Sequence, residues 1–247
     1  MLLKRILSLV VICVVVAGCS SDSKYDSYKD LTAERIYTKA AKNIDVGNYV
    51  LATQDLEALE ARYPYGEYSE KGQIALIYLY YKQKEAPQAE AAIERFIHTH
   101  PKYPDIDYVL YIKGLVHFEE NFGLLFQYLP LDKYKREKSE SYKAFLSFKN
   151  LIVHYPNSKY SEDARKRLIY LKNQMALHEL HVAKYYLKKE AYVAAINRLN
   201  YILTDLDGST ATPKALSLLH HSYKTMGMQT QADSALKTLN YNFPGVS

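Results

Sequence analysis

Residues 89–101 read AEAAIERFIHTHP, and this stretch decides the fold. Ala89 and Pro101 are twelve positions apart, and Ile93 and Phe96 between them have the spacing of one helix face. The same interval from Ala to Pro recurs along the chain, and one further copy keeps the Ala but ends in Asp. These copies are Ala52/Pro64, Ala144/Pro156, Ala232/Pro244 and Ala195/Asp207.

A short break precedes four of these Ala residues, and an amphipathic stretch precedes each break. The breaks are residues 47–49, 84–86, 190–192 and 227–229. The order is therefore helix, tight turn, helix and, in most copies, a terminating Pro. It resembles the tetratricopeptide repeat, a unit of about 34 residues whose neighbours must stack to bury their apolar faces. We predict an all-α fold, a superhelix of about five helix-turn-helix repeats.

Two intervals between repeats are longer than the others, so each must contain extra residues. We assign one excess to an insertion at residues 121–138 and the other to a long helix over residues 161–189. The insertion divides N-terminal repeats, residues 31–120, from C-terminal repeats, residues 139–247.

The N-terminus predicts secretion and lipid attachment. Lys4 and Arg5 precede an apolar stretch, and residues 1–18 form a signal peptide of ordinary length. Val16-Ala17-Gly18-Cys19 resembles the lipobox of bacterial lipoproteins, in which the Cys is acylated after cleavage. We therefore predict acylation at Cys19 and a flexible tether over residues 19–30. Alternatively, Cys13 and Cys19 are ordinary residues of an uncleaved signal anchor.

Four segments carry a resemblance that covers essentially the whole chain: residues 80–82, 91–97, 104–111 and 194–198. With the lipobox and five repeats, they resemble the BamD (ComL-like) lipoproteins, subunits of the β-barrel assembly machinery. The resemblance implies a lipid-anchored protein on the periplasmic face of the outer membrane. It implies three kinds of partner: the periplasmic domains of the barrel subunit, smaller lipoproteins of the complex, and unfolded outer-membrane proteins. The chain departs from the family at residues 205–208, which replace a Tyr-Pro stop.

The N-terminal repeats are expected to bind client protein. Their first helices line the concave face of such a superhelix, and aromatic rings beside Lys suit a peptide ending in an aromatic residue and a carboxylate. Alternatively, these side chains simply pack between helices. The predicted groove residues are Tyr37, Ile44, Ile74, Tyr78, Tyr81, Lys82, Tyr108, Tyr111 and Phe118.

The C-terminal repeats are expected to act as the scaffold for partner subunits. Asn197 and Arg198 match a dipeptide whose Arg, in the family, pairs with an acidic residue of the barrel subunit. A guanidinium can hold a carboxylate with two hydrogen bonds. Alternatively, Arg198 is an ordinary solvated side chain.

Other classes of function find little support in the sequence. The chain has 32 Lys plus Arg against 27 Asp plus Glu, which is too mild an excess for a nucleic-acid binder. No motif of a hydrolase, phosphate loop or metalloprotease occurs, so we predict no enzyme, no cofactor and no metal site. A peptidoglycan-associated lipoprotein is the main alternative, although the 25 Tyr come with no Trp to stack on glycan. A periplasmic glycosidase is a weaker one.

Overall fold

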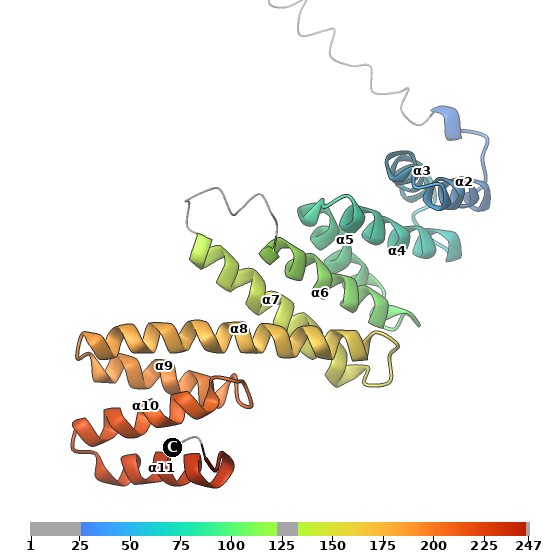
Figure 1. The fold of residues 1–247 in the computed structure, drawn as a ribbon. Helices are drawn as coiled ribbons and strands as arrows, with labels where there is room; N and C mark the ends of the chain where they lie inside the picture. Colours follow the sequence, from blue (N-terminus) through green and yellow to red (C-terminus); the bar gives the residue numbers. More distant parts are fainter. Residues whose placement is uncertain (1–25, 123–132, 246–247) are drawn as a thin grey trace, which may run out of the picture. The chain divides into compact units, whose positions relative to one another are not determined.

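The computed structural model describes residues 26–122 and 133–245 (Figure 1), and within them it is helical throughout, with no strand. Ten α-helices follow a short 3-10 helix, η1 (Asp26–Tyr28). They are α2 (Ala33–Asp45), α3 (Tyr49–Arg62), α4 (Glu67–Lys82), α5 (Ala86–Thr99), α6 (Ile106–Phe122), α7 (Lys133–His154), α8 (Ser161–Lys188), α9 (Tyr192–Thr204), α10 (Thr212–Thr225) and α11 (Gln229–Asn242). Taken in order they make five pairs, so the predicted all-α class and five helix-turn-helix repeats are confirmed.

The chain forms two compact units, which we call unit 1 (residues 1–85) and unit 2 (residues 86–247). The division falls between α4 and α5 rather than at the predicted insertion. Most of that insertion lies outside the described residues. The assignment of client binding to residues 31–120 and of scaffolding to residues 139–247 concerns roles, and it stays a prediction.

Four turns inside the helix pairs share one backbone geometry. Their central residues, Gly47, Lys84, Glu190 and Gly227, have φ between 55° and 74°. In each turn, the residue after the central one donates its N–H to the carbonyl five positions earlier, as Asn48 does to Asn43 at 2.8 Å. The central residue donates its N–H to the carbonyl three positions earlier. This is the Schellman motif, which closes a helix with one left-handed residue.

Small residues let the helices of unit 2 approach closely. The five Ala residues that mark the repeats are fully buried in their own units: Ala52, Ala89, Ala144, Ala195 and Ala232. Gly114 of α6 is tighter still, because a Cβ there would overlap the ring of Phe148 on α7. The predicted landmark positions therefore mark close packing, as their size suggested.

The longest helix, α8, has 28 residues and confirms the long helix predicted over residues 161–189. It also holds the turn in which the chain departs from the family pattern. Lys172 donates through Nζ to the carbonyl of Asp207 at 2.8 Å, and Asn173 Oδ1 accepts from the N–H of Thr210 at 2.9 Å. Leu206 is buried, so the turn that lacks the expected Pro is held by its own apolar side chain and by two side chains of α8.

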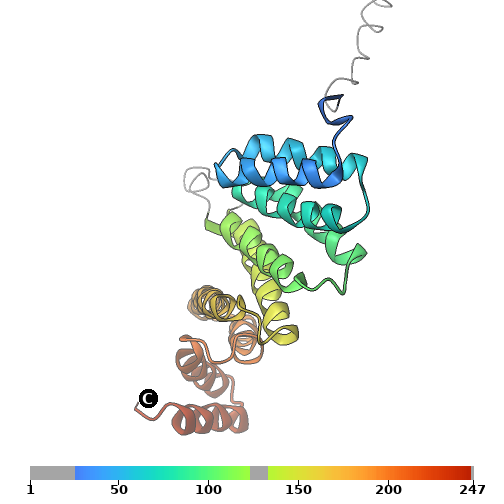
Figure 2. The same cartoon turned by 90° about the vertical axis from the view of Figure 1, so that its right-hand side faces the viewer.

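The described end of the predicted tether, residues 26–30, is docked on the rest of unit 1, while residues 19–25 lie outside the described residues and their flexibility stays a prediction. Tyr28 is 6% exposed, and its hydroxyl donates to Asp55 Oδ1 at 2.6 Å. Asp55 is itself buried on α3, and it also accepts from Asn43 Nδ2 at 2.7 Å and pairs with Lys39 Nζ at 2.8 Å. Figure 2 shows α2 and α3, drawn in blue, lying side by side beneath this segment.

Two more hydrogen bonds fix the backbone of the same segment. Arg62 donates to the carbonyl of Lys29 at 2.7 Å, and the hydroxyl of Tyr63 donates to the carbonyl of Leu31 at 2.9 Å.

None of the helices in residues 26–122 and 133–245 has the length and apolar character to cross a bilayer. The predicted signal peptide and Cys19 lie outside the described residues.

Candidate functional site

In unit 1, the predicted groove residues form half-buried rows on α2 and α4, which are in contact. Tyr37, Ile44 and Tyr78 rest on the core of the unit and keep part of each side chain in solvent. The ring of Tyr37 is 5.8 Å from that of Tyr68, centroid to centroid, so the two helices are joined by aromatic contact. Tyr68 was not predicted, although it lies on α4 among its other Tyr residues.

One end of this row on α4 carries a positive charge. Ile74, Tyr78 and Tyr81 recur at helical spacing and are all half-buried. Lys82 is exposed, and its Nζ lies 6.0 Å from the centroid of the Tyr78 ring. An aromatic surface that ends in an ammonium group can accept an apolar side chain and a carboxylate at neighbouring positions.

In unit 2, the three remaining groove residues are engaged in contacts with other helices. Tyr111 stacks on Tyr160 with 4.9 Å between ring centroids, and Tyr108 lies 5.4 Å from the same ring. Phe118 meets Phe148 edge-on at 6.2 Å, and it also contacts Tyr170 and Arg167. The structure therefore brings six predicted residues together in unit 1 and three in unit 2.

One carboxylate, Asp163 of α8, lies at the edge of the aromatic cluster of unit 2. Its Oδ2 accepts from the hydroxyl of Tyr111 at 2.7 Å and from Arg167 Nε at 2.6 Å. Burial alone would raise the pKa of Asp163, but the two hydrogen bonds hold that pKa below its ordinary value. Burial and the neighbouring Asp163 raise the pKa of Tyr111 to about 12, so its hydroxyl stays a donor. Tyr111 is thus fixed by packing and by a charge-assisted hydrogen bond.

At the predicted partner interface, Arg198 already has a partner within its own chain. Its Nη1 donates to Glu179 Oε2 at 3.2 Å, which links α9 to α8. The Glu179 side chain is 2% exposed, whereas that of Arg198 is 41% exposed and retains further donors toward solvent. Asn197 beside it is exposed. Glu179 was not predicted to belong to this site, although it lies on the same helix face as the buried Ala176, Leu180 and Ala183 of α8.

A second carboxylate is buried among α5, α6 and α7. Glu140 Oε2 lies 2.9 Å from His117 Nδ1, and its Oε1 pairs with Lys143 Nζ at 3.1 Å. Burial favours a higher pKa for Glu140, but the hydrogen bonds from Lys143 and His117 outweigh it and lower that pKa. In the part of the chain that the structure describes, no three His, Cys, Asp or Glu side chains are grouped to hold a metal ion.

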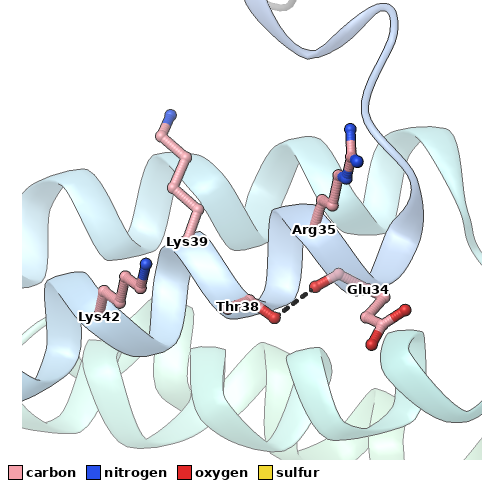
Figure 3. A pocket seen from close by; sticks show the side chains of 5 residues that line it. All are labelled: Glu34, Arg35, Thr38, Lys39 and Lys42. Carbon is pink, nitrogen blue, oxygen red and sulfur yellow. Dashed lines mark hydrogen bonds between the residues drawn. The ribbon is translucent and has the colours of Figure 1, made fainter.

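A basic hollow on α2 was not predicted. It has a volume of about 450 Å³ and is lined by Glu34, Arg35, Thr38, Lys39 and Lys42. Figure 3 shows Arg35 and Lys39 pointing to the side from which the chain enters the unit, while Glu34 points away from them. Thr38 donates its hydroxyl hydrogen to the carbonyl of Glu34 at 2.8 Å and adds no charge.

Comparison with known proteins shows a family whose members match this chain over nearly its full length. A family model described as an outer membrane lipoprotein, YfiO, matches residues 29–239. The outer membrane protein assembly factor BamD of Vibrio cholerae is 35% identical over 225 residues, which cover 91% of this chain and 92% of the relative. BamD of Neisseria meningitidis serogroup A is 32% identical over 246 residues, covering 98% and 92%.

Among solved structures, one from a functional characterization of Pseudomonas aeruginosa PilF covers 86% of this chain and 92% of its own. Its identity of 15% and TM-score of 0.31 are too low to support an argument. The family model and the two assembly factors each match this chain across both units. The chain therefore belongs to the YfiO family of outer membrane lipoproteins, the family that includes the BamD assembly factors.

Proposed function

We propose that this protein is a lipid-anchored, non-enzymatic subunit of the outer membrane protein assembly machinery. In this role it binds unfolded outer-membrane proteins and docks the barrel subunit and smaller lipoproteins at the periplasmic face. The family match over residues 29–239 supports the role in assembly. The observation that carries client binding is the half-exposed aromatic row of α2 and α4, which ends at Lys82.

We propose that Lys82 receives the terminal carboxylate of a client and that Tyr78 and Tyr81 receive its aromatic side chains. The ring of Tyr78 packs against the core of unit 1 and Tyr81 is half-buried, so little side-chain freedom is lost on binding. The three residues of α6 in unit 2 contribute mainly through packing, because their rings are already in contact with α7 and α8.

Reversing the charge at residue 82 tests the groove. With a peptide copied from the last strand of an outer-membrane barrel and ending in Phe, Lys82→Glu is expected to weaken binding about tenfold, since an attractive charge pair becomes repulsive. Titration of the full mature chain with labelled peptide measures this. Lys237→Glu on α11 makes the same charge change at an exposed residue and should leave the affinity unchanged.

Amidation of the peptide sharpens the test, because it removes the carboxylate without changing the aromatic side chains. The unaltered protein should lose affinity for the amidated peptide, whereas Lys82→Glu should then lose little more. If amidation and Lys82→Glu lower the affinity independently, Lys82 does not receive the carboxylate.

The second test concerns Arg198, which we propose binds an acidic residue of the barrel subunit through the donors that Glu179 leaves unused. Arg198→Ala is expected to reduce co-purification of the barrel subunit at least tenfold. It should also lower the free energy of unfolding by about 1.5–3 kcal/mol, because it removes a hydrogen bond to a charged, buried group.

Glu179→Gln separates the two effects. It weakens the internal pair while leaving the guanidinium in place, so stability should fall and co-purification should persist. Equal loss of the partner in both variants would mean that Arg198 acts only through the fold of unit 2.

A further inference from the structure

The outward face of α2 carries basic side chains in a row. Arg35, Lys39 and Lys42 are separated by four and three residues, so they share one face of the helix. They line the hollow seen in Figure 3. No carboxylate among the described residues pairs with Arg35 or Lys42. Lys39 pairs with Asp55, yet its side chain remains 51% exposed. Positive charge is therefore concentrated on this face, with Glu34 at its rim.

This basic row continues into an exposed apolar turn between α2 and α3. Val46 is 77% exposed and follows Lys42 by one helical turn, while Val50 and Leu51 at the start of α3 are 61% and 46% exposed. Gly47 and Asn48 close the turn between them. Basic side chains next to exposed aliphatic ones are typical of a surface that lies in the interface of an anionic membrane.

The chain enters unit 1 beside this surface. The ring of Tyr28 lies 4.6 Å from Lys39 Nζ, and the hydroxyl of Tyr28 is held by Asp55. Residues 20–25 separate the predicted lipid attachment point, Cys19, from η1, so seven Cα–Cα steps join Cys19 to Asp26. Seven steps span at most about 25 Å when fully extended, so an anchor at Cys19 keeps the basic row within reach of the bilayer.

We propose that the row of Arg35, Lys39 and Lys42 and the apolar turn of Val46, Val50 and Leu51 form a membrane-docking surface for anionic phospholipid headgroups. Arg35 and Lys42 bind headgroup phosphates, and the aliphatic side chains enter the interface between headgroups and acyl chains. The proposal rests on the lipid anchor of the proposed function, and it adds a second contact with the same membrane. The peptide groove uses other side chains of unit 1.

A fluorescent probe at residue 50 tests the contact. The mature chain contains no thiol besides the predicted acylated Cys19, so Val50→Cys can be labelled uniquely with an environment-sensitive nitrobenzoxadiazole dye. The labelled full mature chain is reconstituted into vesicles of phosphatidylethanolamine and phosphatidylglycerol. We expect a blue-shifted emission and protection from an aqueous quencher. Val193→Cys, at a residue of α9 in unit 2 that is 62% exposed, should show neither.

Charge reversal identifies the chemistry of the contact. The double variant Arg35→Glu with Lys42→Glu should reduce the ratio of docked to undocked probe by about thirtyfold. The reason is that each basic residue near an anionic surface contributes about 1 kcal/mol. The matched control Lys214→Glu with Lys237→Glu alters exposed lysines of unit 2 and should keep the shift. Vesicles of phosphatidylcholine alone should give no shift.

Three results would overturn the proposal. They are the same emission from residues 50 and 193 in anionic vesicles, a shift that survives reversal of Arg35 and Lys42, and a shift produced by inorganic phosphate or an acidic peptide without vesicles. An unmodified Cys19 in the mass spectrum would remove its premise. Binding of the client peptide, measured on the same samples, judges the groove separately, so failure of one proposal is distinguishable from failure of the other.

Discussion

Gly114→Ala is expected to lower the free energy of unfolding of unit 2 by about 2–3 kcal/mol. A Cβ at residue 114 would overlap three atoms of the Phe148 ring, and Phe148 is fully buried. That ring cannot move aside, because Tyr111 and Phe118 contact it from α6. Overpacking of a dense core forces backbone shifts, and the better helix propensity of a residue with a Cβ offsets only about 1 kcal/mol.

A matched glycine and a compensating change make this prediction specific. At Gly72 of unit 1, a Cβ would lie 2.9 Å from Leu59 Cδ2, the far end of a flexible side chain, so Gly72→Ala should cost less than about 1 kcal/mol. In unit 2, Phe148→Leu should restore part of the stability lost in Gly114→Ala. Urea unfolding followed by circular dichroism measures both. A Gly114→Ala variant as stable as the parent would contradict the close approach of α6 and α7.

Asp55→Ala should destabilise unit 1 by about 3–4 kcal/mol and release the segment that precedes α2. The carboxylate is buried and holds Tyr28 of η1 and Lys39 and Asn43 of α2 at once, so its removal leaves three polar groups without their shared acceptor. Hydrogen exchange should show the release, because the N–H of Leu31, which donates to the carbonyl of Tyr28 at 3.1 Å, would lose its protection.

Tyr28→Phe is the matched control for this change. It keeps the ring that fills the surface of unit 1 and removes only the hydroxyl, so it should cost about 1.5–3 kcal/mol, the range for a hydrogen bond to a charged group. It should also leave exchange at Leu31 slower than in Asp55→Ala. If Asp55→Ala exchanges at Leu31 like the parent, the hydrogen bonds of Arg62 and Tyr63 hold the segment without Asp55.

Periodicity in the sequence predicted the helices because it reports which faces are apolar and where helices stop. The Ala residues that mark the repeats are buried, and Pro64, Pro101 and Pro156 follow the ends of α3, α5 and α7. The long α8 was predicted to within a residue, since no Gly or Pro interrupts it. Local rules suffice here because each helix forms from its own pattern and buries its own row.

The buried charges could not be predicted in the same way, because each has a partner on another element. Asp55, Glu140 and Glu179 each lie in phase with an apolar row, and their partners on other elements are 12 to 27, 23 and 19 positions away in the sequence. Their position in the row was the available signal, since a carboxylate at a core position needs a partner. The same reasoning explains Arg198: its sequence context suggested an external partner, and its pairing with Glu179 depends on how α8 and α9 pack.

The four Schellman turns close four of the five helical hairpins with the same backbone geometry. Every one of these joints closes with the same pair of hydrogen bonds, so a hairpin can be copied or lost without new turn geometry. Two copies have glycine at the left-handed position, while Lys84 and Glu190 accept that backbone at about 1 kcal/mol each. The repeated joint thus keeps one backbone geometry whether or not its left-handed residue is glycine.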